Sequence, residues 1–498
     1  MKETVVDRYP NISNHGLIGD LQTCALVTSD GTIDFFCCPR FDSPSVFAAL
    51  LDAERGGFFS IKPTRDGYVT KQLYFPDTAM LITRFMTPDG VGEVLDFMPV
   101  IEGKPTDRHR LVRHLRVARG TMQFVLKIQP RFNYGRSGHR LEVSESGAVF
   151  RGEDGMHLTL HTAGKVDPAK GGAMAERDGD GLRATFTMRE GESGKGVVLE
   201  SMGDQPRAIA PEELDKMAQE TAAYWKRWLG RSTYTGRWRE TVNRSAMTLK
   251  LLTYEPTGAP VAAATFALPE QVGGERNWDY RFTWVRDGSL SLHALAGLGY
   301  LEEAARFALW FRDRVTEHTG KASGPLKIMY RVDGSSDLVE ENLDHFEGWR
   351  GSRPVRIGNG AADQLQLDIY GEAMDALYDA VERGVPLAHR GWQELTTIID
   401  WVADNWNQPD EGIWETRGGR QDFTYGRFQC WVALDRAIRM AERNGRPANI
   451  AKWAAERDRL YNQIMDRGFN PKEGAFIQHY NTDVVDSSLL LMPLEGFI

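Results

Sequence analysis

Near residue 211, the hydrophobic pattern of this 498-residue chain changes from one typical of strands to one typical of helices. Before that point, two β-rich runs in 21–37 are separated by the turn sequence SDG, and a similar pair in 79–98 is separated by PDG. Further short strands are expected at 110–118, 121–129, 147–151, 156–162, 182–188 and 196–201. Many short strands separated by turns predict an antiparallel β-sandwich.

After the change, apolar residues recur at helical spacing. Pro211, followed by two glutamates, is typical of a helix start, and this first helix runs to about Leu229. Longer helical patterns are expected at about 236–253, 287–298, 301–316, 361–383, 388–406, 424–444 and 447–467. The sequence therefore predicts a β-sandwich domain over 1–210, a helical linker over 211–235 and a helical domain over 236–498.

Composition excludes several classes of function. The net charge of -9 disfavours binding to nucleic acid or anionic lipid, so we expect a small-molecule or oligosaccharide substrate. Only four cysteines, an N-terminus without an apolar signal stretch and no apolar run of membrane-spanning length predict a cytoplasmic protein. The histidines lack metal-ligand spacing and no G-x-S-x-G occurs, so we expect no metal, no cofactor and no serine nucleophile. A homo-oligomer stays open.

All 13 tryptophans lie at or after Trp225, outside the strand-rich part. Several fall on helical stripes, where large helix interfaces explain them. Four lie instead in loops between the expected helices: Trp278, Trp284, Trp349 and Trp414. Aromatic rings in loops around a cleft are surfaces on which sugar rings stack. The pattern indicates carbohydrate binding.

Three loops carry more functional groups than a connector needs. In 273–289, Arg286 and Asp287 are adjacent at a helix start, where they could bind two neighbouring sugar hydroxyls. An ordinary surface ion pair, with the aspartate as a helix cap, explains them equally well. The second loop, 344–363, is rich in arginine and glycine but lacks the features of a phosphate loop; a structural lid held by its own ion pairs is the alternative.

The third loop, 409–424, contains Glu415 directly after Trp414 and between turn glycines. A carboxyl group packed against an indole in a partly dry loop should have a raised pKa. It would then hold a proton near neutral pH, as a general acid must. We therefore interpret Glu415 as a candidate general acid.

At these loops the chain resembles the glycoside hydrolases of family 15, the bacterial glucoamylase-like, trehalase and glucodextranase group. YRFTWVRDGS at 280–289 is similar to that family's Tyr-x-x-Thr-Trp-x-Arg-Asp-Ser segment, and IWE at 413–415 resembles its general-acid motif. FEGWR at 346–350 and SRP at 352–354 resemble its lid. HGLIGD at 15–20 and FDSPSVF at 41–47 are similar to its bacterial branch.

The resemblance implies an N-terminal β-sandwich, a helical linker and an (α/α)6 barrel. It also implies an exo-acting, inverting α-glucosidase that releases β-glucose from a short α-glucan, an isomalto-oligosaccharide or trehalose. The site residues that it implies are Glu415 as the acid, Tyr280 for positioning the water, and Arg286, Asp287, Trp284, Trp349, Arg353 and Trp414 for binding the sugar. Inversion needs a second carboxylate roughly 6.5–9.5 Å from the acid.

Two departures from the family pattern matter. Thr416 stands where fungal members have a second glutamate, which weakens a prediction of starch as the substrate. The family's general base lies in a C-terminal segment that we do not find: about seven barrel helices are expected, an eighth begins near Asp486, and the chain ends on an apolar run. We therefore expect a truncated barrel without its base. Comparing hydrolysis by this chain and by a version extended with the missing helices tests this, since equal rates would refute it.

Two other functions stay open. A related disaccharide phosphorylase would use phosphate in place of the base, and Arg350, Arg353 and Arg356 could form its phosphate pocket. A non-catalytic sugar-binding protein would bind sugar without turnover, and its binding would not depend on Glu415.

Overall fold

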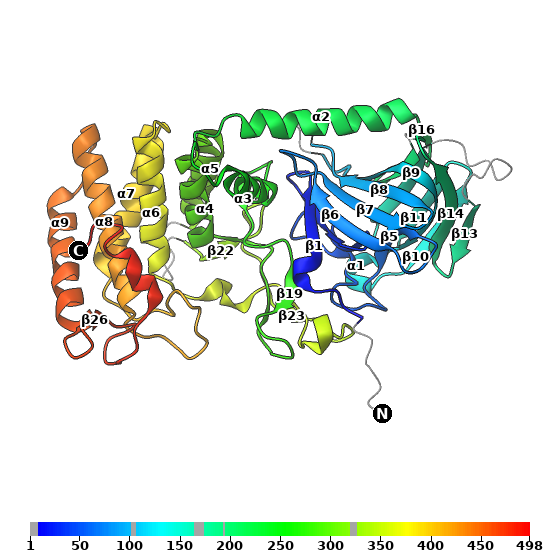
Figure 1. Ribbon diagram of the computed structural model, residues 1–498. Helices are drawn as coiled ribbons and strands as arrows, with labels where there is room; N and C mark the ends of the chain where they lie inside the picture. Colours follow the sequence, from blue (N-terminus) through cyan, green and yellow to red (C-terminus); the bar gives the residue numbers. More distant parts are fainter. Residues whose placement is uncertain (1–7, 101–105, 164–173, 193–194, 319–325) are drawn as a thin grey trace. The chain divides into compact units, whose positions relative to one another are not determined.

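The structure is a computed structural model that describes residues 8–100, 106–163, 174–192, 195–318 and 326–498 (Figure 1). It contains two compact units whose segments alternate along the chain. Unit 1 consists of Met1–Pro256, Ala263–Arg281 and Glu340–Gly358. Unit 2 consists of Thr257–Ala262, Phe282–Val339 and Asn359–Ile498. Each unit is described by itself below.

Unit 1 is built on antiparallel strands, as the sequence predicts. Its strands are β1 (His15–Gly19), β2 (Cys24–Thr28), β3 (Thr32–Cys37), β4 (Ser45–Phe47), β5 (Phe58–Pro63), β6 (Val69–Tyr74), β7 (Leu81–Thr87), β8 (Gly90–Phe97), β9 (Arg110–Gln129), β10 (His139–Ser144), β11 (Gly147–Gly152), β12 (His157–Ala163), β13 (Met174–Asp178), β14 (Gly181–Arg189), β15 (Lys195–Ser201) and β16 (Ala208–Ile209). One set of neighbours runs β1-β2-β3-β5-β9-β14-β13, and the other runs β6-β7-β8-β9-β15-β12-β11-β10.

Strand β9 belongs to both sets and differs from the two strands expected at 110–118 and 121–129. Its first half pairs with β8 and β15, and its second half pairs with β5 and β14. Gly120 lies between the halves in the left-handed region (φ 73°), and a register shift accompanies it. A left-handed glycine with a bulge bends a strand without ending it, so the chain passes from one set to the other without a turn.

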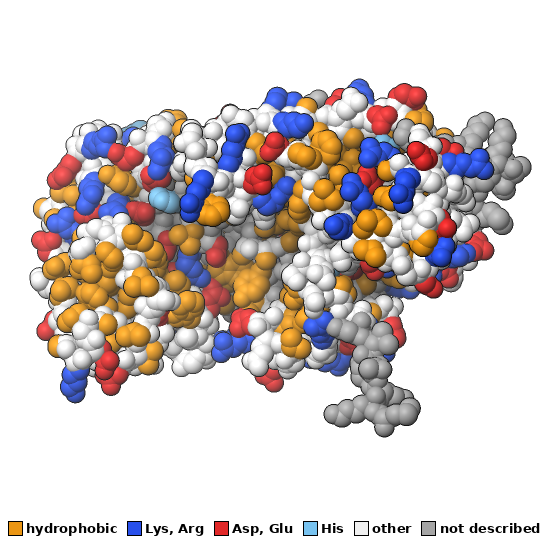
Figure 2. All heavy atoms as spheres, in the orientation of Figure 1, with side chains coloured by type: hydrophobic (Ala, Val, Ile, Leu, Met, Phe, Trp, Pro, Cys, Tyr) orange, Lys and Arg blue, Asp and Glu red, His pale blue; other side chains and the backbone are white. Residues whose placement is uncertain are grey.

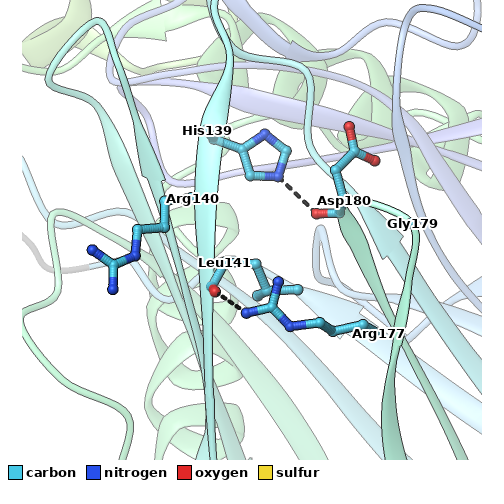
Figure 3. Close-up of a pocket in the computed structure, with 6 residues that line it drawn as sticks. All are labelled: His139, Arg140, Leu141, Arg177, Gly179 and Asp180. Carbon is cyan, nitrogen blue, oxygen red and sulfur yellow. Dashed lines mark hydrogen bonds between the residues drawn. The ribbon is translucent and has the colours of Figure 1, made fainter.

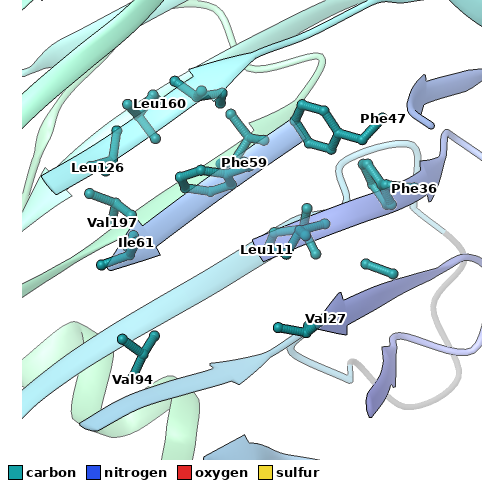
Figure 4. Packing of buried hydrophobic residues seen from close by; sticks show 14 of the residues in the cluster. Val27, Phe36, Phe47, Phe59, Ile61, Val94, Leu111, Leu126, Leu160 and Val197 are labelled. Carbon is teal, nitrogen blue, oxygen red and sulfur yellow. The ribbon is translucent and has the colours of Figure 1, made fainter. Parts of the chain in front are cut away.

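The sandwich core lies between the strands of the two sets (Figure 4). Phe59 and Ile61 of β5 are buried in one cluster with Val94 of β8, Leu160 of β12 and Val197 of β15. Helix α2 (Pro211–Leu229) begins at Pro211, as predicted, and buries Leu214 and Met217 against a second cluster. Helix α3 (Arg239–Leu251) also lies in unit 1.

The two inserted segments of unit 1 complete a third hydrophobic cluster. From the N-terminal part it contains Phe35 and Tyr134, and from the insertions it contains Phe266, Phe346 and Trp349. Short strands in these segments are β19 (Phe266–Pro269), β20 (Asn277–Asp279), β23 (Glu341–Asn342) and β24 (Arg356–Ile357). Residues from the middle of the chain therefore form part of the core of the first unit.

Unit 2 is helical, and its described helices pack in two rows (Figure 1). Helices α4 (Val285–Gly297), α6 (Asp368–Glu382) and α8 (Thr424–Asn444) form one row. Helices α5 (Leu301–His318), α7 (His389–Asn405) and α9 (Ile450–Gln463) form the other. Helix α8 is buried on all sides through most of its length, so its row is the inner one. No helix in the described ranges is both long and apolar enough to cross a bilayer.

One helix boundary differs from the prediction in a way that shapes the site. The pattern predicts a helix over 361–383, but a 3-10 turn (Gly360–Asp363) is followed by a non-helical segment before α6 begins at Asp368. The backbone N–H groups of Leu365 and Leu367 donate to Glu411 Oε2 (2.8 Å) and Asp410 Oδ2 (3.0 Å). These carboxylates replace the carbonyl partners that a helix would provide, so segment 364–367 stays non-helical.

The last residues of the chain form a 3-10 turn (Ser487–Leu491) and an apolar surface. Leu489, Met492 and Phe497 are buried, whereas Leu490 and Leu494 are 73% and 80% exposed. Figure 2 shows hydrophobic side chains gathered on the surface over this part of unit 2. The apolar run expected at the end of the chain is thus half buried and half exposed.

Candidate active site

The site lies where the starts of two inner helices meet the loop before the third. Trp284 and Arg286 are at the N-terminus of α4, Asp368 is the first residue of α6, and Glu415 lies in the loop before α8. The loop is closed at its base by an antiparallel bridge between Asp410 and Gln421. Residues from three separate parts of unit 2 therefore converge on one carboxyl group.

Glu415 has a backbone conformation that a glutamate rarely adopts. Its φ is 53°, in the left-handed region, and its N–H donates to the carbonyl of Gly412 at 3.1 Å. Gly412 itself (φ 71°) leaves room for the ring of Phe423, which a Cβ would meet at 2.6 Å. A non-glycine residue in this region is strained and persists only where the surrounding structure holds it, and such residues concentrate at functional sites. The loop thus fixes the position of Glu415.

Two donors bind the same oxygen of the Glu415 carboxyl group. Oε1 accepts hydrogen bonds from Trp284 Nε1 at 2.7 Å and from Arg286 Nη2 at 3.3 Å. Both donors carry their protons permanently, so Oε1 cannot also be the protonated oxygen. When Glu415 is protonated, the proton therefore lies on Oε2.

Burial raises the pKa of Glu415. Some of the neighbouring charges and dipoles lower this pKa, and others raise it. The positive charge of Arg286 and the hydrogen bonds from Trp284 and Gln366 lower the pKa, while the charge of Asp287 raises it. Burial prevails, so the pKa lies above its usual value. The sequence-based expectation of a raised pKa agrees with this direction, although the indole that contacts the carboxyl group is Trp284.

Arg286 is buried rather than part of a surface ion pair. Its Nη1 donates to Gln366 Oε1 at 2.9 Å and to Asp368 Oδ2 at 2.8 Å. Asp287 is half-buried in the first turn of α4, and burial raises the pKa of its carboxyl group. A half-buried carboxylate beside the acid is suited to accept hydrogen bonds from sugar hydroxyls.

Trp414 is 55% exposed, although its indole nitrogen is bonded. Nε1 donates to Asp486 Oδ2 at 2.7 Å, and the other oxygen of Asp486 accepts from the backbone N–H and the hydroxyl of Ser488, both at 2.9 Å. One edge of the ring is therefore fixed while much of the ring remains accessible. This is the arrangement that a stacking platform for a sugar requires.

Three predicted site residues lie in unit 1, and their roles stay predictions. Tyr280 is half-buried, and its backbone bonds to Thr265 and Ala263. Trp349 is 5% exposed, donates from Nε1 to the carbonyl of Pro10 (3.2 Å) and lies under the guanidinium of Arg350. Arg353 is exposed and donates to the carbonyl of Glu347 at 3.4 Å.

The structure adds residues that the sequence did not single out. Gln366 and Asp368 hold Arg286, and Asp486 holds Trp414. Gln366 and Asp368 were hidden because they fall inside a pattern that predicts a helix. Within the described ranges, no cluster of three or more His, Cys, Asp or Glu side chains is suited to a metal ion.

A surface depression in unit 1 contains none of the predicted site residues (Figure 3). It lies between β10 and the turn from β13 to β14. His139 bonds there to the carbonyl of Asp180 at 2.8 Å, and Arg177 donates to the carbonyl of Leu141 at 2.5 Å. Arg140 and Arg177 are exposed, so the depression lacks the buried polar group of a built binding site.

An antiparallel sandwich, a two-row helical unit and a fixed carboxyl group among aromatic residues define the chain as a carbohydrate-cleaving enzyme. The sequence pattern of "Glycosyl hydrolases family 15" matches residues 236–498, and the pattern "Trehalase-like, N-terminal" matches residues 5–176. The chain belongs to glycosyl hydrolase family 15 and is a glycoside hydrolase with that family's sandwich and (α/α)6 architecture.

Relatives resemble the chain over nearly its full length. A trehalase of Thermoplasma volcanium is 34% identical over 100% of this chain and 77% of its own length. A trehalase of Mycobacterium tuberculosis is 34% identical over 98% of this chain and 73% of its own length. Among solved structures, a bacterial glucoamylase complexed with acarbose has a similar fold, with a TM-score of 0.63, 12% identity, and coverage of 97% of this chain and 72% of that one.

Proposed function

We propose that this protein is a trehalase, which hydrolyses the disaccharide trehalose with inversion of configuration and uses Glu415 as its general acid. The observation that carries the proposal is the one-sided holding of Glu415, whose Oε1 is bound by Trp284 and Arg286. The similarity to trehalases over almost the whole chain supports trehalose as the substrate.

The geometry supports an acid that donates from Oε2. Trp284 and Arg286 fix Oε1, burial raises the pKa of the carboxyl group, and Oε2 is the oxygen that these two donors leave available for a glycosidic oxygen. Proton donation to the leaving oxygen lowers the barrier to bond cleavage. Asp287 would accept hydrogen bonds from the glucose hydroxyls, and the exposed ring of Trp414 would stack against a sugar.

Thr416 favours a short substrate over a long glucan. Its hydroxyl donates to the carbonyl of Glu411 at 3.1 Å, within its own loop. The second glutamate of fungal members would offer a carboxylate to the leaving sugar. Thr416 offers none.

The deciding experiment follows the anomers released from trehalose by proton NMR in the first minutes. Inversion gives equal amounts of α- and β-glucose, because the leaving glucose keeps its α configuration. Release of α-glucose alone would overturn inversion, and glucose 1-phosphate formed in phosphate buffer would identify a phosphorylase. Maltose, isomaltose and dextrin are compared in parallel to test the substrate.

Glu415→Gln tests the acid. We expect kcat on trehalose to fall by roughly 10²–10⁴-fold, the usual contribution of a positioned acid, while trehalose binding remains. Glu473→Gln, which changes an exposed glutamate, is the matched control and should keep the wild-type rate. Trehalose binding without turnover by the wild type, unaffected by E415Q, would instead favour a sugar-binding protein.

A further inference from the structure

Behind Arg286 lies a carboxylate that no substrate can reach. The side chain of Asp368 is fully buried, and its Oδ2 accepts a hydrogen bond from Arg286 Nη1 at 2.8 Å. Its Oδ1 is also buried and has no hydrogen-bond partner among the described residues. Asp368 therefore contacts the site only through the back of the Arg286 guanidinium.

The position of Arg286 creates an electrostatic problem for a general acid. A guanidinium at 3.3 Å from Glu415 Oε1 stabilises the ionised carboxylate, and an acid that ionises too early cannot protonate a leaving group. In a buried site a single charge at this distance has a large effect because little water screens it. Burial already opposes this effect, and a negative charge paired with Arg286 would oppose it further.

We propose that Asp368 is a positioning residue that holds the Arg286 guanidinium and balances its charge, so that Glu415 keeps its proton until the substrate takes it. This inference rests on the proposed role of Glu415. Gln366 assists by binding the same Nη1 at 2.9 Å, but it carries no charge. Among the described residues, Asp368 is the carboxylate that bonds to Arg286 from the buried side.

The local fold explains why the carboxylate sits at this place. Asp410 and Glu411 hold segment 364–367 out of the helix through the N–H groups of Leu367 and Leu365. As a result, α6 starts at Asp368, whose side chain lies at the positive end of the helix dipole. Burial and loop contacts together place one negative charge directly behind Arg286.

Other charged or titratable groups surround this pair, and Asp287 also acts on Arg286 through its charge, without the direct ion pair that Asp368 makes. Across α4, α6, α8 and the acid loop they are Arg286, Asp287, Glu372, Asp410, Glu415, Tyr425 and Arg427. Burial raises the pKa of Glu372 to about 8 and that of Asp410 to about 7, so near pH 7 Glu372 is mostly neutral and Asp410 is only partly ionised. Asp368 is the carboxylate in direct contact with Arg286 on the side away from Glu415.

The test uses the indole of Trp284 as a reporter of Glu415. Because Trp284 Nε1 donates to Glu415 Oε1 at 2.7 Å, the NMR shift of its indole N–H changes when Glu415 ionises. The titration is followed in protein with ¹⁵N-labelled tryptophan, without substrate, in wild type, D368N, D368E and D379N. Glu415→Gln identifies the signal, since that variant should not titrate. Asp379 lies on the same helix about 16 Å away and pairs with Arg383, so D379N is the matched control.

We expect D368N to lower the Glu415 midpoint by roughly one pH unit, because the buried negative charge no longer offsets the positive charge of Arg286. The alkaline limb of kcat/KM for trehalose should move to lower pH by the same amount. D368E keeps the charge and should restore the midpoint, and D379N should leave it unchanged. An unchanged midpoint in D368N would overturn the proposal.

The NMR titration of Trp284 needs no substrate, so it tests the role of Asp368 independently of trehalose hydrolysis. If the wild type does not hydrolyse trehalose, the function fails, whereas the Trp284 titration still reports on Asp368. If D368N does not fold, Asp368→Ser is an equally uncharged replacement. If both neutral variants fail to fold while D368E folds, Asp368 is a structural charge and the proposal is wrong.

Discussion

Two linked carboxyl groups in unit 2, Glu372 on α6 and Glu495 near the end of the chain, have a raised pKa. Glu372 lies one turn after Asp368 on α6, and Tyr425 of α8 donates a short hydrogen bond to its Oε1. Gln429 links Tyr425 (3.2 Å) to Glu495 (3.1 Å). Burial raises the pKa of Glu372 to about 8 and that of Glu495 to about 7. These groups therefore couple the stability of unit 2 to pH.

The sign of that coupling gives a prediction for Glu372. Its folded pKa is raised, so the folded state retains a proton that the unfolded chain has lost above about pH 4.3. Stability should be fully present below that pH and fall as pH rises to about 8, by about 5 kcal/mol from this group. Glu372→Gln imitates the neutral form and should remove part of this fall, so that its thermal midpoint exceeds that of wild type increasingly between pH 5 and 8.5.

Glu442→Gln is the control, since it changes an exposed glutamate on α8. The difference in thermal midpoint between E442Q and wild type should stay constant across the same pH range. A constant difference for E372Q as well would show that Glu372 does not titrate in this window.

At the same scale, the site residues predicted from the sequence are ones that have local signals. Glu415 and Arg286 stand beside tryptophans in loops, and the structure brings their side chains within 3.3 Å. Gln366, Asp368 and Asp486 have no such signal, because their importance comes from partners more than 70 residues away in the chain. Spacing along a sequence cannot reveal such contacts.

At the scale of elements, the inner helices approach one another closely at a glycine. A Cβ on Gly371 of α6 would meet the backbone oxygen of Gln429 on α8 at 2.2 Å. A helix backbone cannot withdraw as a flexible side chain can. The absence of a side chain at 371 therefore sets how closely α6 and α8 pack, and with them Glu372 and Tyr425.

Gly371→Ala should therefore destabilise the protein. In a helix this change usually stabilises by about 0.5–1 kcal/mol, but here the clash should reverse the sign and cost about 1–3 kcal/mol, as overpacking does. Gly297→Ala on α4 is the matched control, since no atom lies within 4 Å of its Cβ position. Urea unfolding measures both, and equal stabilisation by the two changes would contradict the packing described here.

The sequence predicted most elements, and it missed those decided by distant contacts. Helix α8 matches the predicted 424–444 because its own residues form the helix, and Gly445 ends it in the left-handed region. Strand β9 was predicted as two strands, because Gly120 looks like a turn in sequence although neighbours on both sides keep the strand continuous. The start of α6 was missed because Asp410 and Glu411 decide it from another loop.

At the scale of the whole molecule, the units alternate along the chain. Segments 263–281 and 340–358 belong to unit 1, although unit 2 surrounds them in sequence. They contribute Phe266, Phe346 and Trp349 to the cluster that contains Phe35 and Tyr134. Unit 1 therefore cannot be isolated by cutting the chain at one position.

A fragment ending at Pro256 should show this directly. It keeps the sandwich strands but loses the inserted segments, so Phe35 and Tyr134 become exposed. We expect the fragment to bind a hydrophobic dye. Hydrogen exchange at increasing urea concentrations should show that its strands unfold at a lower urea concentration than the same strands in the full chain. Equal protection of β3 in fragment and full chain would show that the insertions add no stability.

The alternation of segments also governs how the protein can fold during synthesis. The first 256 residues leave the ribosome with one side of their core uncovered. The last segment that covers this core ends at Gly358. At about 5–20 residues per second, this gap of about 100 residues lasts roughly 5–20 s. Nascent chains thus pass through a period in which the hydrophobic cluster around Phe35 is open to chaperones and to other chains, and slower translation between these points prolongs that exposure.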